Sequence, residues 1–138
     1  MTESNLAADL ARINALAPFN RWAGFEVASA VPGRVELRMT WREDHGQYSG
    51  FLHAGLVGAL IDTACGFAAH TVAGMVLASH FSVSCLAPAT GRAFVAKAQV
   101  VKAGKRQIFT RADLFAEAED GTSRLVATGE TILMRAEG

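Results

Sequence analysis

Residues 53–70 read HAGLVGALIDTACGFAAH, and this stretch determines the architecture that we expect for the whole chain. It is long, rich in alanine and free of the apolar–polar alternation of a half-buried strand, so it predicts a helix. The helix has no polar side and must therefore be covered on all sides. Asp62, near its middle, is the only Asp, Glu, Lys or Arg between Asp44 and Arg92.

The segments around this helix predict strands. In residues 34–41, apolar and charged side chains alternate, as they do in a strand with one buried face. A short helix is expected near the N-terminus, capped by Ser4 and ended by Pro18. Further extended segments are expected at residues 22–30, 75–86, 93–102, 106–118 and 124–135.

The connections between these segments are short, which favours antiparallel neighbours. The order of elements therefore predicts one α+β domain over residues 1–138, with an antiparallel sheet wrapped around the long central helix. A sheet covers only one side of a helix, so we expect a second subunit to cover the other side. The composition agrees, because 51% of the residues are hydrophobic, which is a high share for a small soluble monomer.

Charge and composition argue against several classes of function. The 13 basic and 13 acidic residues balance, so the chain lacks the positive field of a nucleic-acid-binding protein. The N-terminal residues contain no basic leader followed by an apolar core, and we expect a cytoplasmic protein without a secretory signal. Polar residues and glycines interrupt the apolar residues 50–78, so no membrane span is expected. Cys65 and Cys85 lie in apolar stretches and are interpreted as buried thiols.

A carboxylate in such an apolar helix needs a partner or a function. Burying an unpaired carboxylate costs several kcal/mol, so Asp62 is either satisfied at a subunit interface or used in chemistry, and the residues alone leave both readings open. His53 lies nine residues earlier. In a continuous helix it would be on the opposite side and about 13 Å away along the axis, so the two cannot form an acid–imidazole pair within one chain.

The start of the helix offers a second kind of chemistry. Backbone N–H groups around His53, Ala54 and Gly55 have no helical partner, and with the helix dipole behind them they can polarise a carbonyl group. Gln47 adds an amide in the preceding loop. Together with Asp62, this set is adequate for the transfer of an acyl group to water. The other histidines show no metal-type spacing, and no metal site is predicted.

The motif Gln47-Tyr48-Ser49-Gly50-Phe51-Leu52-His53-Ala54-Gly55, followed by Asp62, resembles the hotdog-fold acyl-CoA thioesterases of the phenylacetate-degradation type. Their pattern is Asn or Gln, two residues, Gly, two residues, His-Gly-Gly, and then an acid further along the helix. The resemblance extends over residues 22–134 and includes the Pro-Ala turn at Pro88. It implies a hotdog fold, in which the sheet wraps around the central helix.

The resemblance also implies a role for each residue. Asp62 would be the nucleophile or the general base, Gln47 would orient the water or the thioester from the neighbouring subunit, the Ala54 N–H would polarise the thioester carbonyl and His53 would hold the loop. Ala54 stands where the family prefers Gly, and a required positive φ would strain it. The residues implied for substrate binding are Gly55, Ser79 in the place of a hydroxyl residue, and the basic Lys105 and Arg106 at a turn.

The expected function is hydrolysis of a small aromatic or medium-chain acyl-CoA to the free acid and coenzyme A, in a homodimer or homotetramer with a shared active site. No cofactor is expected, because coenzyme A is part of the substrate, and neither nucleic acid nor membrane is an expected partner. Two alternatives stay open. One is a hydratase or dehydratase acting on enoyl or hydroxyacyl thioesters, and the other is a hotdog protein that binds acyl-CoA without catalysis.

Overall fold

The structure, a computed structural model, describes residues 3–136. Three α-helices, one 3₁₀ turn and six strands follow each other in this part of the chain. In chain order they are α1 (Glu3–Leu16), α2 (Pro18–Ala23), β1 (Glu26–Val31), β2 (Arg34–Thr40), η1 (Glu43–His45), α3 (Ala54–Ala73), β3 (Val76–Cys85), β4 (Ala93–Ala103), β5 (Gln107–Glu117) and β6 (Ser123–Arg135).

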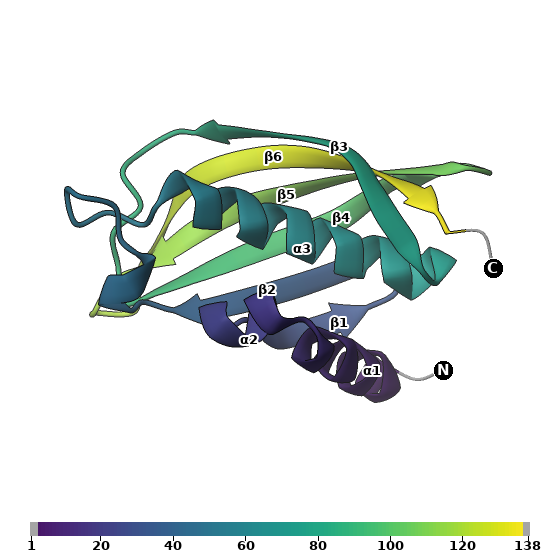
Figure 1. Cartoon of the computed structure of the whole chain (residues 1–138), viewed down its shortest axis with the longest axis horizontal. Coiled ribbons are helices and arrows are strands. Elements are labelled where there is room, and N and C mark those ends of the chain that lie inside the picture. The colour runs from purple at the N-terminus through teal and green to yellow at the C-terminus, as the bar shows by residue number, and fades with distance from the viewer. Residues whose placement is uncertain (1–2, 137–138) are drawn as a thin grey trace.

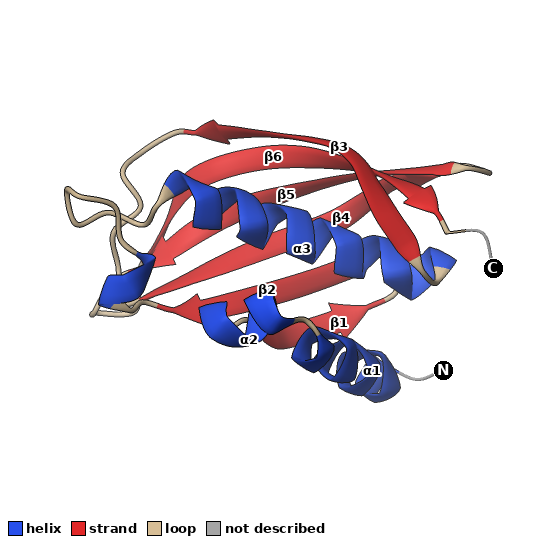
Figure 2. Cartoon of the chain, viewed as in Figure 1, coloured by secondary structure: helices blue, strands red, loops and turns tan. Residues whose placement is uncertain are grey.

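The six strands form one antiparallel sheet in the order β1-β2-β4-β5-β6-β3, and α3 lies along its concave side (Figures 1 and 2). Four of the strand pairings shift register at a bulge: β1–β2, β3–β6, β4–β5 and β5–β6. Each bulge bends its strand and increases the local twist, which allows the sheet to curve around the helix. The predicted α+β hotdog architecture is confirmed.

The core lies between α3 and the sheet. Leu60, Ile61 and Ala64 on α3 are fully buried, and they share one hydrophobic cluster with Leu37 of β2 and Phe94 of β4. Burying one such large side chain contributes about 1.5–3 kcal/mol. By length and composition α3 could cross a membrane, but the sheet buries more than half of it, and it is the core helix of this domain.

The N-terminal region differs from the prediction. Ser4 lies inside α1 rather than at its cap, and Pro18 begins the second helix, α2, instead of ending the helical region. Proline is favoured in the first turn of a helix because the N–H that it lacks has no helical partner there. The expected strand at residues 22–30 is therefore shorter, since Trp22 belongs to α2 and β1 begins only at Glu26.

The edge strand β3 is largely exposed, although its sequence is apolar. Leu77 is 69% exposed and Phe81 is about half exposed. The prediction that both cysteines are buried is wrong for Cys85, which lies at the end of this edge strand, whereas Cys65 on α3 is buried as predicted. A long apolar edge strand with one unpaired backbone side is a natural site for pairing with another chain.

Candidate active site

Asp62 lies on the side of α3 that the sheet does not cover completely. Its side chain is half-buried, and its Oδ1 atom has no contact with solvent and no hydrogen-bond partner. Burial raises the pKa of the Asp62 carboxyl above its usual value. The side chain lines an apolar cavity of about 220 Å³, whose walls include Phe67 from α3, Ile13 from α1 and Leu133 from β6.

His53 is the N-cap residue of α3. Its backbone is extended, with φ −61° and ψ 135°, and its Nδ1 accepts a hydrogen bond from the Gly55 N–H at 2.8 Å. Its carbonyl accepts hydrogen bonds from the N–H groups of Leu56 and Val57 at 2.9 and 3.2 Å. A Cβ on Gly55 would lie only 3.0 Å from the His53 Nδ1, so the glycine makes this cap possible.

These contacts leave one N–H free in the first turn of α3. Among the described residues, nothing accepts a hydrogen bond from the exposed Ala54 N–H, which points away from the helix with the dipole behind it. Ala54 replaces the family's glycine without strain, because only glycines have positive φ in residues 3–136. Among the described residues, Ala54 therefore has the one N–H of this first turn that is left without a partner.

Gln47 lies in a tight turn before α3. The Gln47 N–H donates to the Phe51 carbonyl at 2.8 Å, and the Gly50 N–H donates to the Gln47 carbonyl at 3.1 Å, with Gly50 at φ +83°. The Gln47 Oε1 accepts a hydrogen bond from the Ser49 N–H. Since this oxygen is engaged, the Nε2 group remains as the donor that the side chain can offer to a ligand.

Within one chain, the predicted residues divide into two groups. Gln47, His53 and Ala54 line one cavity of about 290 Å³, together with the exposed Cys85. Asp62 lines a different cavity, and nine residues of helix separate it from His53. One chain therefore brings the loop and the helix start together and leaves the carboxylate apart from them.

None of the residues predicted for substrate binding lines either of these two cavities, although the Gly55 N–H donates to His53. Ser79 is the bulged residue of β3, and its Oγ donates to the Ile132 carbonyl at 3.2 Å, while its neighbour Ala78 lines the cavity of Asp62. Lys105 and Arg106 are exposed in the turn between β4 and β5. Their roles remain predictions.

The structure adds residues that the sequence did not single out. Thr63 and His70 line the cavity of Asp62, and Tyr48, which is 100% exposed, lines the cavity of Gln47. His70 follows Asp62 by two helical turns, a spacing that could have indicated a shared side of the helix. In residues 3–136, no three His, Cys, Asp or Glu side chains are grouped as metal ligands.

His45 is another buried polar residue near the start of α3. Its side chain is 1% exposed and packs edge-on against Trp22, with ring centroids 5.5 Å apart. Burial lowers the pKa of His45, as does the charge of Arg42, whereas Asp44 and the Ala23 backbone act in the opposite direction. The Ala23 backbone lies near the ring, but neither ring nitrogen makes a hydrogen bond of normal geometry. The His45 carbonyl accepts from the His53 N–H at 3.0 Å, which links this residue to the start of α3.

Comparison with known proteins agrees with this fold. The model of the Thioesterase superfamily matches residues 49–122, which include the Gly50–Gly55 motif and Asp62. The chain therefore belongs to the thioesterase superfamily. Human acyl-coenzyme A thioesterase 13 is 35% identical over 106 residues, which cover 75% of this chain and 74% of that protein. A protein of Halobacterium salinarum, named only as a candidate esterase, is 37% identical over 89 residues, and the match covers 59% of this chain and 58% of that protein.

Solved structures show the same architecture. A thioesterase family protein from Silicibacter pomeroyi is 36% identical, with a TM-score of 0.91, and the match covers 96% of this chain and 99% of that one. The PaaI protein from the phenylacetic acid degradation operon of Escherichia coli has a TM-score of 0.86 at 21% identity, covering 99% and 98% of the two chains. This second likeness concerns the fold alone.

Proposed function

We propose that this protein hydrolyses the thioester of a small aromatic or medium-chain acyl-CoA to the free acid and coenzyme A. The observation that carries the proposal is the pair of complementary features on α3. Asp62 is an unpaired carboxylate in an apolar cavity, and Ala54 presents a free N–H at the positive end of the same helix. Water activation and carbonyl polarisation are the two requirements of thioester hydrolysis.

The two features would meet in an assembly of two copies. We infer that β3 pairs with β3 of a second copy, because this edge strand exposes apolar side chains and an unpaired backbone side. In such an isologous contact both copies use the same surface patch, so each copy contributes the same residues to its partner. Asp62 of one copy would then face Gln47 and Ala54 of the other, and the assembly would contain two equivalent sites.

The reaction follows from these roles. The Ala54 N–H donates to the thioester oxygen as negative charge develops on it, and the Gln47 Nε2 group orients the water or the thioester. As general base, Asp62 removes a proton from the water while the water oxygen attacks the carbonyl carbon. The carbon–sulfur bond then breaks, and the proton passes to the thiolate of coenzyme A. As nucleophile, Asp62 would itself attack the carbonyl carbon, the carbon–sulfur bond would break and the thiolate of coenzyme A would leave. Water would then cleave the resulting anhydride to the free acid and the Asp62 carboxylate, and the proton released would pass to the thiolate. In both routes the raised pKa makes the carboxylate a stronger base.

The acyl group would occupy the apolar cavity beside Asp62. Its volume of about 220 Å³ equals the liquid volume of roughly seven water molecules, which suits an aromatic ring or a chain of medium length. This size supports a substrate range like that of the phenylacetate-degradation type. We place the reaction in the cytoplasm, and we propose that it needs no metal or redox cofactor.

The direct test is the release of free thiol from phenylacetyl-, benzoyl- and straight-chain acyl-CoAs. Asp62→Asn is the matched variant, because it removes the charge and keeps the size. We expect the wild type to release thiol from at least one of these substrates and Asp62→Asn to lose most of that activity. Equal rates for the two proteins would contradict the mechanism, and tight binding without release would favour the non-catalytic acyl-CoA-binding alternative.

A further inference from the structure

The loop of residues 45–53 before α3 forms a small hairpin, and His45 lies at its base. The His45 carbonyl accepts a hydrogen bond from the His53 N–H at 3.0 Å, and an isolated antiparallel bridge follows one residue further on. Gln47 lies two residues after His45 in the chain, and Ala54 directly follows His53. The two groups proposed to act on the thioester therefore extend from the same hydrogen-bonded base.

The ring of His45 lies between this hairpin and α2. It is 1% exposed and packs edge-on against Trp22 of α2, with ring centroids 5.5 Å apart. The Arg42 guanidinium lies over the Trp22 ring at 5.4 Å and donates a hydrogen bond to the Trp22 carbonyl. Because Arg42 ties α2 to the turn that contains His45, the ring is held between two parts of the chain that are joined to each other.

A cavity of about 320 Å³ adjoins the His45 ring. Phe19 and Trp22 contribute aromatic walls from α2, and His53 and Gly55 contribute walls from the start of α3. When a buried side chain is truncated, the surrounding structure relaxes into the space that is left. Here that space would join the existing cavity, so the base of the hairpin would have room to move. The ring is therefore the group that keeps the hairpin and the start of α3 apart from α2.

The His45 ring holds this position through its shape rather than through hydrogen bonds. Neither ring nitrogen has a hydrogen-bond partner of normal geometry among the residues that the structure describes. A side chain that acts through its shape can be replaced by another flat ring. A positive charge on the ring, however, would be buried without a hydrogen-bond acceptor, which is costly.

Two charged side chains and one further imidazole lie near the His45 ring. Arg42 and Asp44 belong to the same turn, and His53 lines the adjoining cavity, to which α2 contributes aromatic side chains alone. Burial and the charge of Arg42 lower the pKa of His45, whereas Asp44 and the Ala23 backbone act in the opposite direction. Below that pKa, the protonated ring would leave its buried place and the hairpin would move with it.

We propose that His45 is a positioning residue for thioester hydrolysis, whose neutral ring holds the hairpin so that the Ala54 N–H and the Gln47 amide reach the thioester together. Its effect on turnover rests on the proposed function, whereas its effect on the backbone does not. His45 lines neither the cavity of Asp62 nor that of Gln47. Its removal should therefore lower kcat and leave KM nearly unchanged, since a displacement of about 1 Å can cost about 10²-fold in rate.

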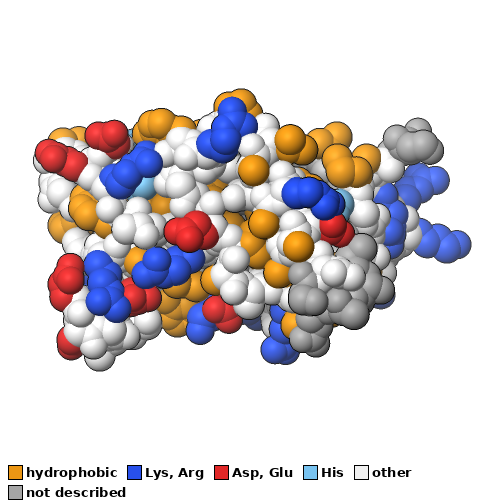
Figure 3. Space-filling model, turned by 90° about the horizontal axis from the view of Figure 1, so that it is seen from below, with side chains coloured by type: hydrophobic (Ala, Val, Ile, Leu, Met, Phe, Trp, Pro, Cys, Tyr) orange, Lys and Arg blue, Asp and Glu red, His pale blue; other side chains and the backbone are white. Residues whose placement is uncertain are grey.

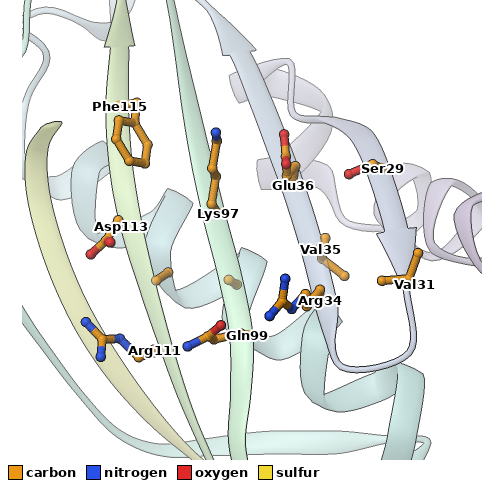
Figure 4. Close-up of a pocket in the computed structure, with 12 residues that line it drawn as sticks. Ser29, Val31, Arg34, Val35, Glu36, Lys97, Gln99, Arg111, Asp113 and Phe115 are labelled. Atoms are coloured by element: carbon orange, nitrogen blue, oxygen red, sulfur yellow. The ribbon is translucent and has the colours of Figure 1, made fainter. Parts of the chain in front are cut away.

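Three variants test this role in thiol release at pH 7. His45→Ala removes the ring, and we expect kcat to fall by roughly 10- to 100-fold with little change in KM. His45→Phe keeps a flat ring and should retain most of the wild-type kcat. Val35→Ala is the matched control and should keep the wild-type kcat. Val35 is as buried as His45, but it lies at the start of β2, at the opposite end of this strand from the hairpin (Figure 4).

The dependence of kcat on pH distinguishes positioning from a loss of stability. In the wild type, kcat should fall at low pH for two reasons, because His45 takes up a proton and because the Asp62 carboxylate becomes protonated. His45→Phe keeps only the second reason. The acidic side of its pH profile should therefore involve one proton fewer than that of the wild type, which the slope of log kcat against pH measures.

Backbone amide signals in NMR spectra test the same role without substrate. In the wild type, the Gln47 and Ala54 amide signals should shift with the titration of the His45 ring, and in His45→Phe this step should be absent. In His45→Ala, the His53 amide hydrogen should exchange faster with solvent, because its acceptor is displaced. Circular dichroism confirms that each variant is folded.

The results that would overturn the role of His45 differ from those that would overturn the proposed function. A folded His45→Ala protein with the wild-type kcat, a His45→Phe protein as slow as His45→Ala, or amide signals that do not follow the His45 titration would each contradict the positioning role. A wild type that releases no thiol would contradict the proposed function instead. In that case the amide titration and the exchange of the His53 amide hydrogen would still decide whether His45 holds the hairpin.

Discussion

At the scale of single residues, Asp62 combines a cost to stability with the proposed chemistry. Its pKa is raised in the folded chain, so ionisation opposes folding. The stability of the wild type should therefore fall as the pH rises from about 4 through the raised pKa of the folded state.

Asp62→Asn separates these two effects. The variant should lose most of its turnover and yet unfold at an equal or higher temperature than the wild type at pH 7. Its advantage should shrink as the pH falls and the wild-type carboxyl becomes protonated. Thermal unfolding at a series of pH values, measured beside thiol release, tests this. A variant that is clearly less stable than the wild type at pH 7 would mean that the carboxylate has a stabilising partner.

His45 gives the opposite dependence on pH. Its pKa is lowered in the folded chain, so below about pH 6.5 the unfolded chain binds a proton that the folded chain does not. Stability should therefore be complete above this pH and decrease as the pH falls toward the lowered pKa. In His45→Gln this part of the decrease should be absent, which denaturant unfolding between pH 5 and 8 would detect. Parallel curves for the variant and the wild type would contradict the assignment.

At the scale of the element, the first turn of α3 allows a backbone group to be removed. Ala54→Pro deletes the one free N–H, and proline is well tolerated at the first position of a helix. The preceding His53, with ψ 135°, already has the conformation that a following proline requires. We expect turnover to fall by roughly 10²–10³-fold, as for other oxyanion donors, with little change in unfolding temperature. Ala54→Gly, which keeps the N–H, is the control and should remain active.

The edge strand β3 can be tested with a single charge. Leu77→Lys places a lysine on the exposed edge, where lysines oppose strand pairing. We expect the mass of the assembly to fall. Turnover should fall as well, because the shared sites would separate and because Leu77 also lines the cavity of Asp62. Leu16→Lys, at a position 76% exposed on α1, is the matched control. Full activity in a Leu77→Lys protein that has lost pairing through β3 would show that one chain contains a complete site.

The sequence predicted some elements well, for physical reasons that differ from element to element. The apolar run around Asp62 is longer than a single strand, so it indicated a buried helix. In the structure, α3 extends over Ala54–Ala73 as one element. The alternation in residues 34–41 identified β2 to within one residue. Pro18 was misinterpreted because proline both ends helices and begins them, and only the packing of the following residues distinguishes the two cases.

At the scale of the whole molecule, the position of β3 could not be predicted from local patterns. Its sequence is as apolar as that of a central strand, but β3 lies at the edge beside β6, and only tertiary pairing determines this order. Cys85 is exposed for the same reason. The separation of His53 from Asp62 was predictable, because helix geometry alone places them on opposite sides. The grouping of Gln47 with Cys85 in one cavity required the fold.

The surface of the molecule agrees with an assembly held by specific patches. Viewed from below, it is a mixture of apolar, basic and acidic side chains without a large area of one charge (Figure 3). The formal net charge of zero agrees with this balance of basic and acidic side chains. The proposed contact between copies would therefore depend on a local feature, the exposed apolar side chains of the β3 edge.

The central claim is that each active site combines Asp62 of one copy with Ala54 of another, and mixing two inactive variants tests it most directly. Asp62→Asn and Ala54→Pro should each be nearly inactive alone. After they are unfolded together and refolded, mixed pairs contain one site with both groups intact, so thiol release should recover to about a quarter of the wild-type rate. A mixture that stays as inactive as its components would show that the two groups act within a single chain, or not together at all.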